Sequence, residues 1–307
     1  MEDALTIFFF SLFLLEVLVG ILGDGLLAGL FGREWVRRRK LPPCDMIVAS
    51  LGASRFFLLW VSMLNGICLE VIPKFYYSPI IFYSSFVWAL LNLFSFWFAA
   101  GLSIFYCLKI ATFTNPLFLW MKQKTSGMVP WLLLGSVFVS CVSTFPCIIY
   151  YSIKPPWMNN SENGTEAVLK TFQSLKIMPV IFIPLSVPFL LLLISSILLT
   201  TSLRRHLRAM QHHGPSLQDC STKAHAHALA MLASFLSFYV WYFIILIVTS
   251  TTAIPSGSPW FWLFQVITFL GTTCHSLLLT WSNPKIRGAL ERGLRHIPAC
   301  QTPYGTA

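Results

Sequence analysis

Residues 224–284, AHAHALAMLASFLSFYVWYFIILIVTSTTAIPSGSPWFWLFQVITFLGTTCHSLLLTWSNP, contain no aspartate, glutamate, lysine or arginine. Only a short polar break at residues 254–259 (IPSGSP) divides this stretch into two apolar runs. A bilayer core is ~30 Å thick, and about 20 helical residues are needed to cross it. Each run is long enough to cross once, so the stretch predicts two membrane-spanning helices.

The same pattern recurs along the whole chain. Short polar segments separate seven apolar stretches, and charged residues are only 10% of the sequence while hydrophobic residues are 56%. A soluble domain would carry about a quarter charged residues, and a membrane β-barrel would alternate in segments of about ten residues. We therefore predict an all-α membrane protein, a seven-transmembrane-helix bundle forming one domain (1–307). The predicted spans lie near residues 5–31, 46–68, 80–109, 128–151, 176–203, 225–249 and 260–282.

Basic residues are concentrated on one side of this predicted bundle. Of the 21 lysines and arginines, 16 fall in the loops and tail of one side and four on the other. Loops rich in lysine and arginine stay in the cytoplasm, so we expect a multi-pass plasma-membrane protein with an extracellular N-terminus and a cytoplasmic C-terminus. The net charge of +10 then reflects topology and attraction to anionic membrane lipid, and nucleic acid is not an expected partner.

Two N-glycosylation sequons lie in the loop between the fourth and fifth spans, at residues 159–161 (NNS) and 163–165 (NGT). This loop is on the predicted extracellular side, where glycosylation takes place. We predict glycans on Asn159 and Asn163, and chance occurrence of so short a motif is the alternative. At the other end of the chain, apolar and basic residues alternate after residues 283–285 (NPK). That pattern predicts a short amphipathic C-terminal helix along the inner leaflet.

Three charged residues fall inside predicted spans, which is costly and therefore indicates function. They are Glu16 and Asp24 in the first span and Arg55 in the second. At 1.5 Å per residue, Asp24 and Arg55 lie ~10 and ~14 Å from the same membrane boundary. We expect them to form an ion pair, which would act as a packing clasp or as a conformational switch. Glu16 lies two turns further out, where it is either protonated or directed into a hydrated interior.

A second group of polar and aromatic residues falls in the outer half of the later spans. Trp88 and Asn92 are four residues apart, hence on one helix face, and an indole beside an amide suits an organic ligand. The candidate ligand-binding residues are Trp88, Asn92, Tyr239, Tyr242 and Gln265. Packing is the alternative for the aromatic ones, because Phe, Trp and Tyr make up 15% of the chain. We expect Trp260 and Trp262 in the interfacial aromatic belt.

No catalytic grouping is apparent in the sequence. His275 is the only histidine deep in a span, and no Cys, Asp or Glu stands near it at metal-binding spacing. Without a nucleophile–base pair or a metal triad, an enzyme fails the usual criteria. We therefore expect no enzymatic activity, no cofactor and no metal.

Several segments have to be compared together: the first span around Glu16 and Asp24, residues 44–55 (CDMIVASLGASR), 102–111 (LSIFYCLKIA), 202–206 (SLRRH), 225–229 (HAHAL), His275-Ser276 and residues 283–285. Together they resemble the type 2 taste receptors, which are bitter taste receptors. Residues 32–36 (GREWV) and 129–136 (VPWLLLGS) look most like the subgroup containing members 41, 60 and 62. The family usually has asparagine where Asp24 stands and lysine where Ala230 stands.

The resemblance implies a G-protein-coupled receptor for small bitter agonists, coupled to a gustducin-like heterotrimeric G protein, phospholipase C and calcium release. The implied conformational-switch residues are Glu16, Asp24, Arg55, Tyr106, Lys109, His206 and His275. A ligand would enter a cavity among helices three, five, six and seven and shift the population toward the active arrangement. The rival functions are a small-solute transporter or channel and a non-bitter chemosensory receptor of the same fold. Action as a single chain and action as a homo- or hetero-oligomer both stay open.

Overall fold

The computed structural model describes residues 2–72, 75, 78–111, 115–153, 178–211, 233–234, 236–248, 258–283 and 285–288. Its long helices are α1 (Glu2–Arg38), α2 (Pro43–Val71), α3 (Pro79–Ile110), α4 (Pro116–Ile153), α6 (Met178–Gln211) and α8 (Pro259–Ser282). All six contain a stretch long and apolar enough to cross a membrane, and a shorter apolar helix, Leu236–Val248, lies between α6 and α8 in the chain. Each of these described helices overlaps one of the predicted spans, and the all-α membrane fold is confirmed.

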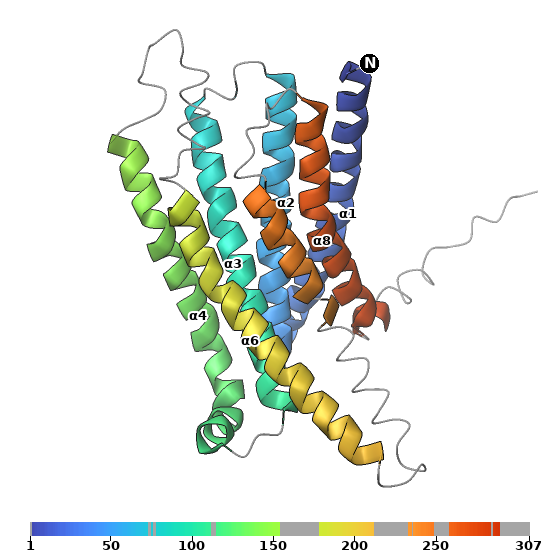
Figure 1. Ribbon diagram of the computed structural model, residues 1–307, viewed down its shortest axis with the longest axis vertical. Helices are drawn as coiled ribbons and strands as arrows, with labels where there is room; N and C mark the ends of the chain where they lie inside the picture. The colour runs from blue at the N-terminus through green and yellow to red at the C-terminus, as the bar shows by residue number, and fades with distance from the viewer. Residues whose placement is uncertain are drawn as a thin grey trace, which may run out of the picture.

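Neighbouring helices run up and down through the bundle (Figure 1). One end, here called the N-terminal end, carries the first residues of α1, α3, α6 and α8; the opposite end, called the Arg38 end, carries the last residues of α1. The first helix packs between α2 and α8, while α3 contacts α2, α4 and α6. The second and third helices thus each contact three of the other long helices, and α6 crosses α3 at a tilt (Figure 1).

Two of the three apolar clusters among the described residues join most of these helices. The larger one is built around α2 and α3, with Leu51, Phe96 and Leu102 among its buried residues. The smaller one lies between α1, α2 and α8 and includes Phe13 and Trp262. Other large apolar side chains point outward, such as Leu22 at 67% and Trp131 at 76% exposed. An apolar surface of this kind suits contact with lipid, as the sequence predicts.

Local sequence explains where two of the helices begin. Ser78 precedes Pro79 and accepts a hydrogen bond from the amide of Ile80, and Ser258 caps α8 from Trp260 in the same way. A serine cap followed by proline satisfies a free amide and supplies a preset φ angle. Several helices extend past the predicted spans, because hydropathy marks only the part that crosses lipid; α1, for example, continues to Arg38.

Candidate functional site

A cavity of about 230 Å³ opens between α1, α2, α3 and α8 near the N-terminal end of the bundle. Its lining is mostly aromatic with a few amide and hydroxyl groups: Phe13, Ser62, Asn65, Trp88, Trp262 and Gln265 are among its residues. Apolar walls with few polar groups are typical of small-molecule sites. Of the four helices expected around a ligand, only the third and the seventh (α3 and α8) line this cavity, together with the first two helices. The lining of this cavity thus differs from the predicted set of helices three, five, six and seven, which stays a prediction.

Trp262 forms a deeply buried wall of this cavity. Its side chain is only 1% exposed, its ring centroid lies 4.6 Å from that of Phe10, and its indole N–H donates to Glu70 Oε2 at 3.1 Å. Beside it, a Cβ on Gly66 would lie 2.9 Å from Phe13, so only glycine fits without displacement of that ring. The expectation that Trp262 lies in the lipid belt was wrong, because hydropathy does not tell which way a helix face turns. Trp260, by contrast, is 62% exposed.

Below the cavity, the buried guanidinium of Arg55 joins four helices. Arg55 is 1% exposed, and its Nη1 lies 2.6 Å from His275 Nδ1 and donates to Ser276 Oγ at 3.3 Å. Its Nη2 donates to the Tyr239 hydroxyl at 2.8 Å, and its Nε donates to Ser95 Oγ at 3.3 Å. An arginine can only donate, so Nδ1 of His275 must accept and carries no proton. We call these five residues the polar core.

A further hydrogen bond lies between the polar core and the cavity. The Tyr242 hydroxyl donates to Asn92 Oδ1 at 3.0 Å, and the Phe96 ring lies between the two tyrosines of this helix, 4.9 Å from Tyr239 and 5.6 Å from Tyr242. The only space among these side chains in the described part of the chain is about 10 Å³, which is room for about one water molecule. The five predicted ligand-binding residues therefore separate. Trp88 lines the cavity with Gln265, whereas Asn92 and the tyrosines lie packed beneath it.

Asp24 does not form the expected ion pair with Arg55. It is fully buried, yet among the described residues neither of its carboxylate oxygens has a hydrogen-bond partner, and the same holds for Glu16. The donors of Arg55 are directed to the polar core instead. The prediction used only the depth of each residue along its helix. It did not include the rotation of each helix about its axis, which decides where a side chain points. On this face α1 packs closely against α8, where a Cβ on Gly20 would lie 2.9 Å from Thr273 Oγ1.

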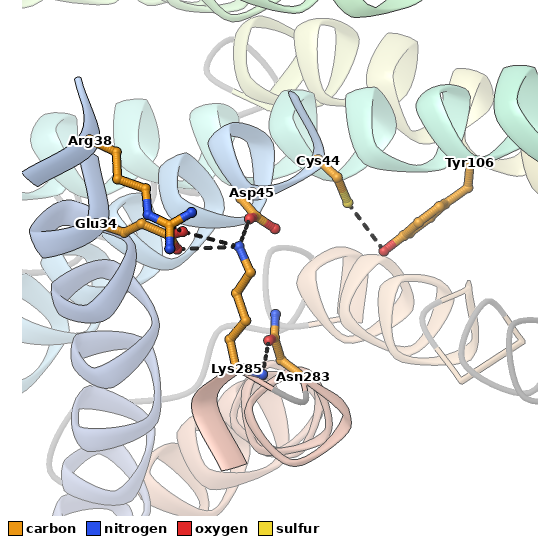
Figure 2. Close-up of polar contacts among 7 residues, drawn as sticks. All are labelled: Glu34, Arg38, Cys44, Asp45, Tyr106, Asn283 and Lys285. Carbon is orange, nitrogen blue, oxygen red and sulfur yellow. Dashed lines mark hydrogen bonds and ion pairs between the residues drawn. The ribbon is translucent and has the colours of Figure 1, made fainter. Parts of the chain in front are cut away.

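The Arg38 end has a charged cluster that sequence reasoning missed (Figure 2). Lys285 Nζ donates to Asp45 Oδ2 at 2.6 Å and to Glu34 Oε2 at 3.2 Å, and Glu34 Oε1 lies 3.6 Å from Arg38 Nε. These bonds raise the pKa of Lys285, the bond to Asp45 most strongly. The cluster ties the segment after α8 to α1 and α2. The sequence signal that could have revealed this cluster was the presence of Glu34 and Asp45 within or beside basic segments of the chain.

The remaining predicted switch residues lie toward the same end. The thiol of Cys44 lies 3.6 Å from the Tyr106 hydroxyl, which joins α2 to α3 (Figure 2). Lys109 Nζ lies 6.0 Å from the centroid of the Phe105 ring. His206 belongs to α6, but its side chain lies outside the described residues. So do Asn159, Asn163, Ala230 and the tail beyond residue 288; within 285–288 the chain is helical.

The fold is that of a multi-pass helical membrane protein, with an aromatic-lined cavity near one end, a polar core beneath it and a charged cluster at the opposite end. The family model described as Taste receptor protein (TAS2R) matches residues 1–297. Taste receptor type 2 member 41 of Pan troglodytes is 40% identical over 309 residues, which cover 95% of this chain and 96% of the relative.

Two further relatives agree with this match. Taste receptor type 2 member 134 of Rattus norvegicus is 40% identical over 284 residues, which cover 92% of this chain and 85% of the relative's length. Member 60 of Pongo pygmaeus is 36% identical over 285 residues, covering 90% and 88%. The chain therefore belongs to the taste receptor type 2 family, and the resemblance noted in the sequence is confirmed.

Proposed function

We propose that this receptor detects small, mostly apolar bitter compounds in the cavity between α1, α2, α3 and α8. The observation that carries the proposal is the cavity itself, whose aromatic walls are interrupted by the amide of Gln265. Apolar walls supply most of the binding free energy, and a few polar groups fix the orientation of the bound molecule. A volume of about 230 Å³ suits a small compound and excludes a peptide.

We infer that α3 carries the response from the cavity into the polar core. Trp88 lines the cavity, and Asn92 lies one turn further along the same helix face, where it accepts from Tyr242 of the helix Leu236–Val248. A compound that binds one arrangement of Trp88 better than another shifts the population toward that arrangement. Arg55 of α2 then couples the change in α3 to α8, because it bonds to Ser95 of α3 and to His275 of α8.

On this proposal, the Arg38 end lies in the cytoplasm and contacts a gustducin-type G protein, which acts through phospholipase C and calcium release. The basic bias of the loops supports this orientation. Arg204 and Arg205 at the end of α6 are exposed. Lys122 donates to the carbonyl of Ala111 at 3.1 Å and so holds the segment after α3 against α4. Movement of these ends would change the surface offered to the G protein, and Tyr106, Lys109 and His206 are the residues we assign to that movement.

The test is a calcium assay in cells that express the receptor with a chimeric gustducin-type subunit and receive a panel of bitter compounds. For any active compound, Trp88→Ala should raise the half-maximal concentration by about 10- to 100-fold, since losing a buried aromatic contact costs roughly 1.5–3 kcal/mol. Trp260→Ala is the matched control, because Trp260 is 62% exposed and lies outside the cavity lining. Equal effects of the two variants would contradict the assignment. Uptake or conductance independent of the G protein would favour a transporter.

A further inference from the structure

A second and larger groove lies at the Arg38 end of the bundle. It has a volume of about 1070 Å³ and is bounded by the last turns of α1 and by residues 285–288. Its floor is apolar and includes Phe31, which is 1% exposed, and Ile286, which is 2% exposed. Its walls carry the side chains of Arg33, Glu34, Arg37, Arg38 and Lys285. The groove is therefore a basic rim above an apolar base.

The charges of the rim are only partly compensated. Lys285 and Arg38 share the carboxylates of Glu34 and Asp45, so these two basic residues are neutralised by two acidic ones (Figure 2). Arg33 and Arg37 have no ion-pair partner in the part of the chain that the structure describes, and both are exposed. They lie four residues apart on α1, hence next to each other on one helix face about 6 Å apart. The rim thus offers two adjacent guanidinium groups to an outside anion.

The groove also lies at the level where lipid meets water. Apolar side chains remain exposed on the same turns as the arginines: Trp35 is 59% and Val36 69% exposed. About two and three turns before Arg33 along α1, large side chains such as Leu26 (41%) and Leu22 (67%) face outward. Tryptophan among basic residues at the end of a spanning helix is typical of the membrane interface. A lipid lying along α1 would therefore bring its headgroup to the groove.

We propose that this groove binds the headgroup of a phosphoinositide, an inositol lipid that carries phosphate monoesters. A guanidinium matches the oxygens of a phosphate with two parallel hydrogen bonds, and two adjacent uncompensated arginines match a headgroup with more than one phosphate. Phosphatidylserine has a single net negative charge and would leave one arginine without a partner. The inference rests on the proposed function in one respect: the proposed orientation of the receptor places this lipid in the cytoplasmic leaflet.

The test uses the full-length receptor purified in detergent, with no agonist and no G protein. Native mass spectrometry would measure the fraction of receptor that binds short-chain phosphatidylinositol bisphosphate. The variant Arg33→Gln/Arg37→Gln should weaken binding by roughly thirty-fold, from about a factor of five for each basic residue near an anionic lipid surface. The control Arg204→Gln/Arg205→Gln removes the same charge from exposed arginines of α6 and should leave binding within about two-fold.

Three outcomes would overturn the proposal: no binding to the unaltered receptor, equal losses in the two double variants, or equal binding of phosphatidylserine. The second of these would mean that net charge, not the groove, attracts the lipid. A further variant, Arg33→Lys/Arg37→Lys, keeps both positive charges but cannot form the two parallel hydrogen bonds of a guanidinium. It should give an intermediate loss of binding. This variant keeps the test decisive if the glutamine variant fails to fold. Because no signalling is measured, failure here leaves the bitter-receptor proposal to its own calcium assay.

Discussion

Replacing Arg55 by glutamine should destabilise the receptor more than any comparable change on its surface. Arg55 is 1% exposed, and its guanidinium donates to side chains of three neighbouring helices. The acceptors are Ser95 of α3, Tyr239 of the helix Leu236–Val248, and His275 and Ser276 of α8. Hydrogen bonds to a charged group contribute about 1.5–3 kcal/mol each but do not add. Breaking a buried charged network typically costs about 3–5 kcal/mol, and we expect a loss of that size.

The assay is thermal unfolding of the purified receptor in detergent. At about 2–4 °C for each kcal/mol in a protein of a few hundred residues, Arg55→Gln should lower Tm by on the order of 10 °C. The matched control is Arg205→Gln, which makes the same chemical change at an exposed position and should cost less than ~0.5 kcal/mol. A cycle with Tyr239→Phe should give a coupling free energy of about 1–2 kcal/mol. Equal melting temperatures for Arg55→Gln and Arg205→Gln would refute the reasoning.

Three other predictions follow from single contacts. Tyr242→Phe leaves the buried Asn92 amide without its 3.0 Å donor and should lower the free energy of unfolding by about 1–3 kcal/mol; an unchanged Tm would count against that bond. Asp24→Asn should leave Tm unchanged or raise it, because no ion pair is lost; a fall of the ~3–5 kcal/mol expected for a broken buried pair would restore the original prediction. The folded-state pKa of Lys285 lies above its ordinary value of 10.5, so its stabilising contribution is present below about that pH and is lost as pH rises through the folded-state pKa. Lys285→Met should remove this dependence in melting curves taken between pH 9 and 12, with an effect under ~1 kcal/mol because the side chain is 48% exposed.

Hydropathy and charge bias were sufficient to predict the helices, since crossing lipid demands long apolar helices whatever their neighbours are. The cost of a charge inside a membrane span also selected Arg55, which the structure places in the polar core. Depth along a helix follows from residue counting. For that reason Trp88 and Gln265 were expected at one level, and both line the same cavity.

What the sequence did not supply is the rotation of each helix about its axis. Asp24 and Arg55 have matching depth, but the Arg55 donors go to Ser95, Tyr239 and His275, and within the described residues neither Asp24 oxygen accepts a hydrogen bond. The same limitation misplaced Trp262, which turns inward to Glu70. Contacts between segments far apart in the chain, such as Lys285 with Asp45, depend on the assembled bundle and carry no local pattern.

The central claim is that the cavity beside Trp88 opens to the cell exterior and holds the agonist. Ser85 lines that cavity, so a receptor carrying Ser85→Cys can be treated in intact cells with a membrane-impermeant thiol reagent, with the unaltered receptor as the background. We expect labelling from outside, and slower labelling in the presence of a compound that is active in the calcium assay. Labelling only after the cells are permeabilised, or labelling at the same rate with and without the compound, would contradict the account.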